Sequence, residues 1–335
     1  MNKKDLQTYD KQKMYDVYDK WPEIAEKSFL KKFAKIKFEK VDHIVFAGMG
    51  GSGAIGDIIS SIFSKNSMHV SIVKGFLLPQ TVNSKTLVIT VSISGNTKET
   101  LVVLDSARKL NCRIIAFSSG GKMNAYCKKH KIMHINVEKF HSPRASFPSF
   151  LYSILNVMKP IIPIKNSDIV DSIRELKKTR NNISSQNITK TNSALNLAKW
   201  INDIPIIYYP WGLQAAAIRF KNSLQENSKV HVIAEDIVEA CHNGIVSWER
   251  KSKVKPILIQ GRDDYIKTKK RWVVVKKYFK KNKIDYWEIS SVNGNILSKL
   301  INLIYVLDYC SIYKAVLLKT NPTPVKSIDF VKGKM

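Results

Sequence analysis

Short runs of β-branched and aromatic residues alternate with longer stretches of helical apolar spacing, and this alternation constrains the fold more than any other feature of the sequence. Strands separated by helices are typical of βαβ units, in which consecutive strands lie parallel in one sheet. The sequence therefore predicts an α/β fold with two doubly wound, mostly parallel sheets. The predicted strands are residues 44–47, 70–73, 87–91, 113–117 and 133–135, followed by 206–209, 230–233, 256–259 and 286–289.

The length of 335 residues favours two domains, because single hydrophobic cores rarely grow beyond about 250–300 residues. Helical apolar spacing, with Pro22 at an expected helix start, precedes the first strand, and a polar stretch separates the two series. We therefore predict an N-terminal helical cap at 1–40, a first domain at 41–165, a linker helix at 166–192, a second domain at 193–320, and a C-terminal segment, expected to be helical, at 321–335.

The two series have the pattern of a degenerate repeat. Residues 43–50 align with residues 205–212, strand with strand and turn with turn, although so short a match also arises by chance. The first copy continues with Gly-Ser-Gly at 51–53 and the second with Leu-Gln-Ala at 213–215. If the repeat is real, only the first copy kept a glycine-rich loop.

The chain is strongly basic, with 55 Lys and Arg against 27 Asp and Glu and a net charge of +28. Such a charge attracts nucleic acid, anionic membranes or small phosphorylated substrates. Basic residues are densest between Arg250 and Lys283, yet Lys is spread over the whole chain and no nucleic-acid-binding motif accompanies it. We therefore expect a small phosphorylated substrate and no nucleic-acid partner.

The cysteines and the N-terminal residues predict a cytoplasmic protein. Cys112, Cys127, Cys241 and Cys310 lie far apart, without the spacing of a disulfide framework or a metal site, so we expect no bound metal. The first residues lack the apolar core of a signal peptide, and no window of about 18 uninterrupted apolar residues follows. We expect no membrane partner.

A glycine-rich loop, GMGGSG at Gly48–Gly53, follows the first predicted strand and opens a helical stretch. This pattern matches a dinucleotide-binding turn. A dinucleotide site also needs an acidic residue at the end of the next strand to bind a ribose hydroxyl, but that strand is followed by Lys74 and Gly75. A turn required only for close packing of helix on strand is another reading. Binding of a phosphate group by the loop is the third.

The segment SISGNTKET, which follows the predicted strand at 87–91, favours phosphate binding. Ser92, Ser94 and Thr97 surround a glycine just before a helical stretch. Backbone N–H groups at a helix N-terminus together with such hydroxyls suit a monophosphate. An ordinary helix cap needs only one hydroxyl. Since ligands of open α/β sheets bind at the carboxyl ends of the strands, we expect both loops to line one site.

With these two motifs the sequence resembles the SIS (sugar isomerase) domain family. The resemblance implies two SIS-type domains and a sugar phosphate whose phosphate group is bound by Gly51, Ser52, Ser92, Ser94 and Thr97. It leaves open whether such a domain serves an isomerase, an aminotransferase or a sensor.

Five further motifs lie at Ser142–Ser146, Glu226–Lys229, Glu239–Asn243, Asn321–Val325 and Ile328–Lys332. Together they resemble the bifunctional phosphoglucose/phosphomannose isomerases of the phosphoglucose isomerase superfamily. The resemblance implies interconversion of glucose 6-phosphate and mannose 6-phosphate with fructose 6-phosphate, without a cofactor or metal. It implies that Glu226 shuttles the proton, that Arg144 stabilises the enediolate, and that His242 and Lys332 assist ring opening. It also implies a homodimer in which His242 enters the partner's site.

Each proposed catalytic residue also has a structural interpretation. Glu226 could be an exposed helix-end carboxylate, Arg144 a surface cation, His242 a core histidine and Lys332 one of many lysines. The sequence also departs from the family, with Val238 in place of a proline and Gly244 in place of a frequent acidic residue, so His242 lacks that neighbouring carboxylate. A non-catalytic sugar-phosphate sensor would need only the phosphate loops.

Overall fold

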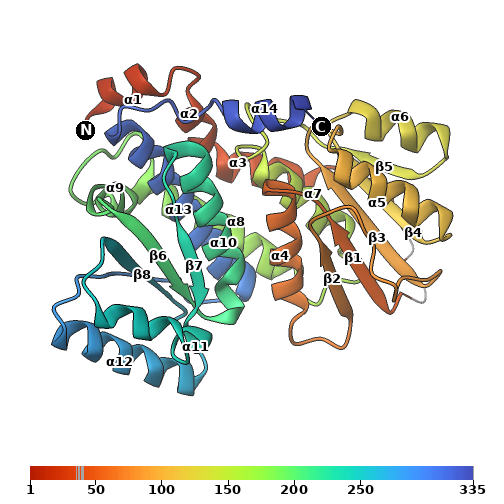
Figure 1. The fold of residues 1–335 in the computed structure, drawn as a ribbon. Helices are drawn as coiled ribbons and strands as arrows, with labels where there is room; N and C mark the ends of the chain where they lie inside the picture. Colours follow the sequence, from red (N-terminus) through yellow and green to blue (C-terminus); the bar gives the residue numbers. More distant parts are fainter. Residues whose placement is uncertain (35, 37, 39–40, 335) are drawn as a thin grey trace. The chain divides into compact units, whose positions relative to one another are not determined.

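The computed structural model describes residues 1–34, 36, 38 and 41–334, and its contacts divide the chain into two compact units (Figure 1). The first-sheet unit comprises Lys20–Arg174, and the second-sheet unit comprises Met1–Asp19 together with Glu175–Met335. The division at Asp19 falls inside the predicted cap of residues 1–40, whose end at residue 40 lies outside the described residues. The last residue of the predicted C-terminal segment, at 335, does so too.

The first-sheet unit contains a five-stranded parallel sheet with the order β2-β1-β3-β4-β5. Every residue of β1 and β3 is buried, as expected of central strands in a sheet covered by helices on both faces. The strands are β1 (His43–Ala47), β2 (His69–Val73), β3 (Thr86–Ser92), β4 (Arg113–Ser118) and β5 (Met133–Asn136). The helices are α3 (Trp21–Leu30), α4 (Gly51–Phe63), α5 (Lys98–Lys109), α6 (Gly121–Lys129), α7 (Phe147–Val157) and α8 (Asn166–Ile183), which continues past the unit boundary.

The second-sheet unit contains a four-stranded parallel sheet with the order β7-β6-β8-β9. Its strands are β6 (Ile204–Tyr209), β7 (Ile233–Asp236), β8 (Val254–Gln260) and β9 (Trp287–Ser290). Its helices are α1 (Lys3–Tyr9), α2 (Met14–Asp19), α9 (Ser193–Trp200), η1 (Trp211–Leu213), α10 (Gln214–Ser223), the π-helical turn η2 (Leu224–Ser228), α11 (Ile237–Ala240), η3 (Gly244–Glu249), α12 (Ile266–Lys281), α13 (Ile296–Leu317) and α14 (Lys326–Lys334).

These sheets confirm the predicted α/β class with two mostly parallel sheets. The corresponding strands β1 and β6 occupy equivalent places, because each pairs with the next strand in sequence on one side and the following strand on the other. One strand prediction is wrong in position. The strand predicted at residues 230–233 is instead β7 at Ile233–Asp236, three residues later. Lys229 adopts a left-handed conformation (φ 59°) after the π-helical turn, and the chain joins the sheet only after residue 232.

Helix α13 is the core of the second-sheet unit. By length and composition it could cross a membrane, but 89% of its most apolar window is buried within the structure, as in the core helix of a globular protein. Tyrosines on α13 also bond to the N-terminal residues: the Tyr305 hydroxyl donates to the Tyr18 carbonyl at 2.6 Å, and the Tyr309 hydroxyl donates to the Tyr15 carbonyl at 3.1 Å. These hydrogen bonds hold the first 19 residues against the rest of the second-sheet unit.

A buried ion pair joins α10 to α13. The Arg219 guanidinium donates to Asp308 Oδ2 from Nη2 at 2.6 Å and from Nε at 3.0 Å, and Asp308 is fully buried. Ser223 donates to Asp308 Oδ1 at 2.7 Å, and Tyr18 donates to Oδ2 at 3.2 Å. Three elements, α2, α10 and α13, therefore depend on one carboxylate for hydrogen bonding.

We predict that Asp308→Ala lowers the free energy of unfolding by about 3–5 kcal/mol, because it leaves the Arg219 charge buried without its counter-charge. Asp285→Ala is the matched control, since the Asp285 side chain is 62% exposed in its pair with Lys255 (3.1 Å), and it should cost less than about 1 kcal/mol. Urea titration followed by circular dichroism measures both. Equal losses in the two variants would contradict the structural role given to Asp308.

Candidate functional site

The two glycine- and serine-containing loops lie side by side at the carboxyl edge of the first sheet. Strands β1 and β3 pair in parallel, with Ala47 opposite Thr90, so the segments that follow them begin next to each other. A Cβ atom on Gly48 would lie 2.9 Å from Ser52 Cβ and 3.0 Å from the Val91 carbonyl oxygen. Glycine is therefore required at this position so that the first loop can approach the second strand closely.

The hydroxyl groups at this edge are held in place by hydrogen bonds to one another and to the backbone. Ser92 Oγ and Thr97 Oγ1 are 2.9 Å apart, and the Asn96 N–H donates to Ser94 Oγ at 3.2 Å. Ser52 is buried in the first turn of α4, whereas the Ser94 side chain is exposed. We call Gly51, Ser52, Ser92, Ser94 and Thr97 the hydroxyl cluster. It combines the N-termini of α4 and α5 with hydroxyl donors, an arrangement that favours an anion.

A third segment, Ser118–Gly121 at the carboxyl end of β4, supports this edge, and the sequence interpretation missed it. Ser119 Oγ donates to the Ile93 carbonyl at 2.6 Å, and the Met123 N–H donates to the Gly95 carbonyl at 2.9 Å. A Cβ atom on Gly121 would lie 2.5 Å from the Ser94 carbonyl oxygen. The signal was visible as two serines and two glycines directly after a predicted strand.

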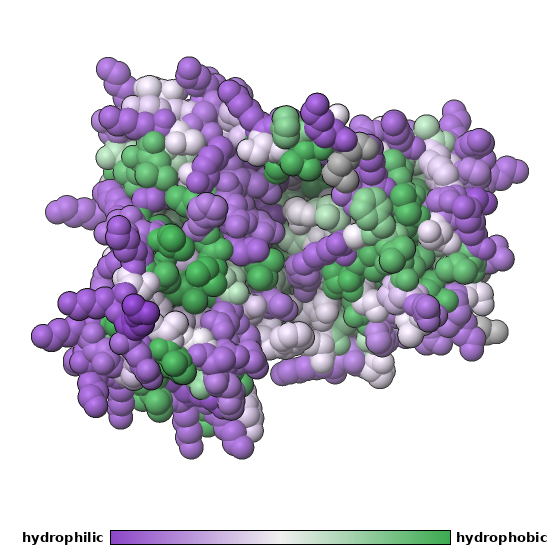
Figure 2. Space-filling view, in the orientation of Figure 1, coloured by the Kyte–Doolittle hydropathy of each residue, from purple (hydrophilic) through white to green (hydrophobic). Residues whose placement is uncertain are grey.

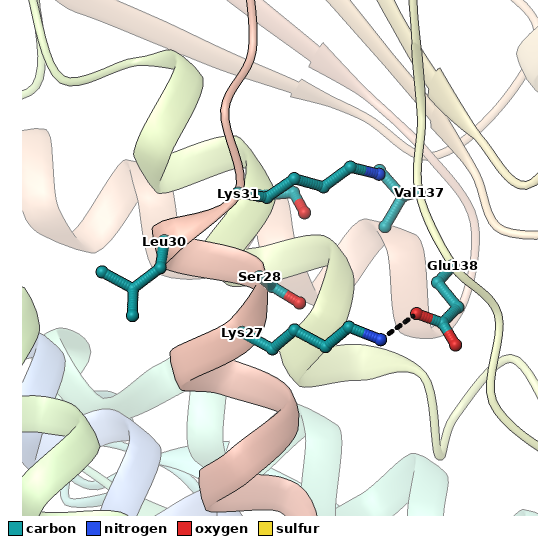
Figure 3. Close-up of a pocket in the computed structure, with 7 residues that line it drawn as sticks. Lys27, Ser28, Leu30, Lys31, Val137 and Glu138 are labelled. Carbon is teal, nitrogen blue, oxygen red and sulfur yellow. Dashed lines mark hydrogen bonds and ion pairs between the residues drawn. The ribbon is translucent and has the colours of Figure 1, made fainter.

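Arg144 is buried in the segment between β5 and α7. Helix α3 holds this segment in place: Lys27 forms an ion pair with Glu138 at 3.0 Å, and Trp21 Nε1 donates to the Ala145 carbonyl at 3.0 Å. Figure 3 shows Lys27 of α3 and Lys31, which directly follows that helix, extending toward residues 137–138 across a cavity of about 590 Å³. Arg144 is therefore a buried side chain on an anchored segment, and its interpretation as a surface cation is wrong.

Glu226 lies in the π-helical turn η2 that ends α10. Single π-helical turns are rare and are frequently found at functional sites. On the following residues, Asn227 Nδ2 donates to Ser311 Oγ at 2.8 Å and Ser228 Oγ donates to the Ser311 carbonyl at 2.7 Å, which fixes the turn on α13. Lys229 Nζ donates to the carbonyl of Glu226 at 2.6 Å and to that of Pro322 at 3.3 Å. The turn thus meets the C-terminal segment.

His242 lies on the loop between α11 and η3, with an exposed side chain, so it is no core histidine. Its backbone N–H donates to the Glu239 carbonyl at 2.8 Å, and Asn243 Nδ2 donates to Glu239 Oε1 at 2.7 Å. A Cβ atom on Gly244 would lie 2.5 Å from Glu235 Oε2 and 2.7 Å from Oε1. The Glu235 carboxylate therefore occupies the space that a side chain at position 244 would need.

Glu235 is itself half-buried at the edge of the second sheet. Burial, with smaller contributions from the neighbouring charges of Glu239 and Asp236, raises the pKa of its carboxyl above the usual range. Such perturbed carboxyls cluster at functional sites, although structural clusters also produce them.

Lys332 lies on α14, a helix without buried residues. Its structural surroundings therefore add nothing to the role implied by the sequence. For the part of the chain that the structure describes, no group of three or more His, Cys, Asp or Glu side chains could hold a metal ion.

Comparison with known proteins identifies the family. A family model described as a bacterial phospho-glucose isomerase C-terminal SIS domain matches residues 190–335, and one described as a SIS domain matches residues 37–157. A bifunctional phosphoglucose/phosphomannose isomerase from Caldicellulosiruptor bescii is 30% identical over 311 residues, which cover 90% of this chain and 91% of the relative. This chain belongs to that family. The resemblance drawn from separate motifs is confirmed.

Other similarities outline the breadth of the group. A D-glucosamine-6-phosphate 4-epimerase from Sulfolobus acidocaldarius is 27% identical and covers 73% of this chain and 77% of its own length. A solved structure of a hypothetical protein from Thermus thermophilus superposes with a TM-score of 0.74 at 13% identity, covering 96% of this chain and 89% of that one. The structural likeness shows a shared fold and confirms the fold class.

We predict that Gly95→Ala destabilises the first-sheet unit by at least about 2 kcal/mol. Gly95 has φ +71°, and a Cβ atom there would collide with the Gly120 carbonyl oxygen, so both backbone strain and overpacking oppose the substitution. Gly75→Ala is the control, since nothing lies within 4 Å of its Cβ position, and it should change stability by less than about 0.5 kcal/mol. Thermal unfolding of both variants tests the difference, and similar melting temperatures would contradict it.

Proposed function

We propose that this protein is an aldose–ketose isomerase that interconverts glucose 6-phosphate and mannose 6-phosphate with fructose 6-phosphate. The observation that carries this proposal is the similarity to bifunctional phosphoglucose/phosphomannose isomerases over nine tenths of the chain. Because glucose 6-phosphate and fructose 6-phosphate are intermediates of glycolysis and gluconeogenesis, the proposal assigns the protein to those pathways and to the cytoplasm. The proposed domains are those given by the sequence, with the phosphate bound by the first.

The proposed chemistry moves one proton between neighbouring carbons and uses no cofactor or metal. The Glu226 carboxylate removes the proton from C2 of the open-chain aldose and returns it to C1, and a hydroxyl proton passes from O2 to O1, so the carbonyl group moves from C1 to C2. The Arg144 guanidinium balances the negative charge of the enediolate. His242 and Lys332 act as acid and base when the sugar ring opens. The anchored, buried position of Arg144 and the π-helical turn at Glu226 support these roles.

The hydroxyl cluster is the proposed phosphate site. Its side chains and the N–H groups in the first turns of α4 and α5 offer several hydrogen-bond donors to a dianionic phosphate. The net positive charge of the protein also attracts such an anion. The substrate is thereby held by its 6-phosphate and not by the carbons that react. The non-catalytic sensor remains the alternative, and no similarity above is to a sensor.

The phosphate assignment predicts a loss of affinity when a hydroxyl is removed. Ser94→Ala and Thr97→Ala should each weaken binding of fructose 6-phosphate by about 1–3 kcal/mol, the range for hydrogen bonds to a charged group. Ser106→Ala, farther along α5, is the matched control and should bind normally. Calorimetry gives the affinities, and a coupled assay on the unaltered protein decides between isomerase and sensor. Unchanged affinity in both variants would contradict the phosphate assignment, and absence of turnover would contradict the isomerase.

We also propose that Glu235 positions the His242 loop, because its carboxylate occupies the space beside Gly244. Glu235→Ala should therefore lower turnover, whereas Glu235→Gln, which fills the same space, should keep most of it. Glu249→Gln, in the same segment, is the control. A coupled assay measures turnover, and equal turnover in Glu235→Ala and the unaltered protein would refute this role.

The proposed homodimer has active sites that combine Glu226 of one chain with His242 of the other. The exposed side chain of His242 fits this role. When Glu226→Gln and His242→Ala chains are refolded together, about half of the dimers are mixed, and each mixed dimer has one site without a defect. About a quarter of the parental activity should therefore return, although each variant alone is nearly inactive.

Native mass spectrometry confirms that mixed dimers have formed. If they have formed and activity stays absent, both residues belong to the same chain and the shared site is wrong.

A further inference from the structure

The second-sheet unit contains a groove of about 530 Å³ between α12 and the segment from α11 to η3. We call it the Cys241 groove. Its volume lies in the range of small-ligand sites, about 300–1,000 Å³. In Figure 2 the region of α11 and α12 shows a hydrophobic patch bordered by hydrophilic surface. The groove is lined by Cys241, Ile245, Lys267, Lys270, Arg271, Val274, Val275 and Tyr278.

The floor of the groove is apolar. Val275 belongs to the buried core of the unit, and Cys241, Ile245 and Tyr278 are half-buried against that core. Val274 forms part of the wall with 64% of its surface exposed. An exposed apolar wall over a fixed apolar floor favours a ligand with a compact apolar body.

The rim of the groove is cationic. Lys267, Lys270 and Arg271 stand at i, i+3 and i+4 on α12, and therefore lie on neighbouring turns of one face. Within residues 1–34, 36, 38 and 41–334, none of the three has a carboxylate at ion-pair distance, and Arg271 donates no hydrogen bond although it is half-buried. A half-buried guanidinium without an acceptor is stabilised by an anion that enters the groove.

We propose that the Cys241 groove binds a small organic carboxylate whose body is aromatic or branched aliphatic. The carboxylate would accept paired hydrogen bonds from Arg271, a geometry that guanidinium groups favour. The apolar body would cover Val274, Val275 and Tyr278. A sugar phosphate has no apolar body to fill this floor, and a polyanion such as nucleic acid needs no apolar floor. The inference stands without the proposed isomerase activity.

The groove also lies next to the loop of His242. Cys241 lines the floor and directly precedes His242 in the chain. The apolar body of a bound ligand would therefore contact the first residue of the His242 loop. The Cys241 thiol is a natural reporter for the groove, because a ligand seated over it excludes alkylating reagents.

The test uses the full chain with 1-naphthoate as the anionic probe and 1-naphthylmethanol as its neutral counterpart. Calorimetry should show saturable, one-site binding of 1-naphthoate. Arg271→Gln and Val274→Asp should each weaken it at least about tenfold, through loss of the paired bonds and through repulsion. Lys277→Gln and Val273→Asp are the matched controls on α12 that do not line the groove, and affinity there should stay within about twofold.

A second measurement needs no variant. Saturating 1-naphthoate should slow alkylation of Cys241 in the unaltered protein, followed by peptide mass spectrometry, while alkylation of Cys112 keeps its rate. Equal affinity of the neutral probe, equal affinity in Arg271→Gln, or unprotected Cys241 would each overturn the proposal. It would also be overturned if Val274→Asp split a dimer without changing 1-naphthoate affinity, because the occupant would then be a second copy of the chain.

Discussion

The buried ion pair between Arg219 and Asp308 is the constraint on which the second-sheet unit depends. A carboxylate with no exposure to water is stable only when its charge and its lone pairs are satisfied, and here Arg219, Ser223 and Tyr18 all donate to it. Because these donors come from α10 and α2 while Asp308 belongs to α13, the pair fixes α10 and α2 against α13. The π-helical turn of Glu226 directly follows α10, so the pair also helps to hold the proposed base against α13.

In the first-sheet unit the main constraint is the close approach of backbone segments to one another. Gly48 brings the first loop against Val91, and Gly95 and Gly121 bring the segments after β3 and β4 together. Side chains are excluded at these points, so the loops that carry the hydroxyls lie close together at one edge of the sheet. The equivalent strand of the second sheet, β6, is followed by Trp211 and Leu213 instead. The two units therefore share strand topology, but only the first-sheet unit has the glycines of the proposed phosphate site.

Much of this arrangement could be predicted from the sequence. The apolar runs of central strands such as β1 and β3 are buried on both faces, which makes their pattern strong, and SISGNTKET stands out because three hydroxyls surround one glycine. The edge strand β7 was harder, because its ladder residues Glu235 and Asp236 are acidic and hydropathy favoured the apolar residues before them. No local pattern predicts a π-helical turn. The Glu235 carboxylate lies beside Gly244 only because the chain folds back on itself, so the sequence around either residue does not predict their proximity.

Proton transfer by Glu226 is the central claim, and it is tested most directly by NMR detection of deuterium incorporation into sugar phosphate in D₂O. With fructose 6-phosphate and the unaltered protein, we expect glucose 6-phosphate and mannose 6-phosphate labelled at C2. Glu226→Gln should abolish both the label and turnover while fructose 6-phosphate still binds, and moving the carboxylate by one position in Gln225→Glu/Glu226→Gln should not restore them. Deuterium incorporation by Glu226→Gln at a rate near that of the unaltered protein would contradict the account.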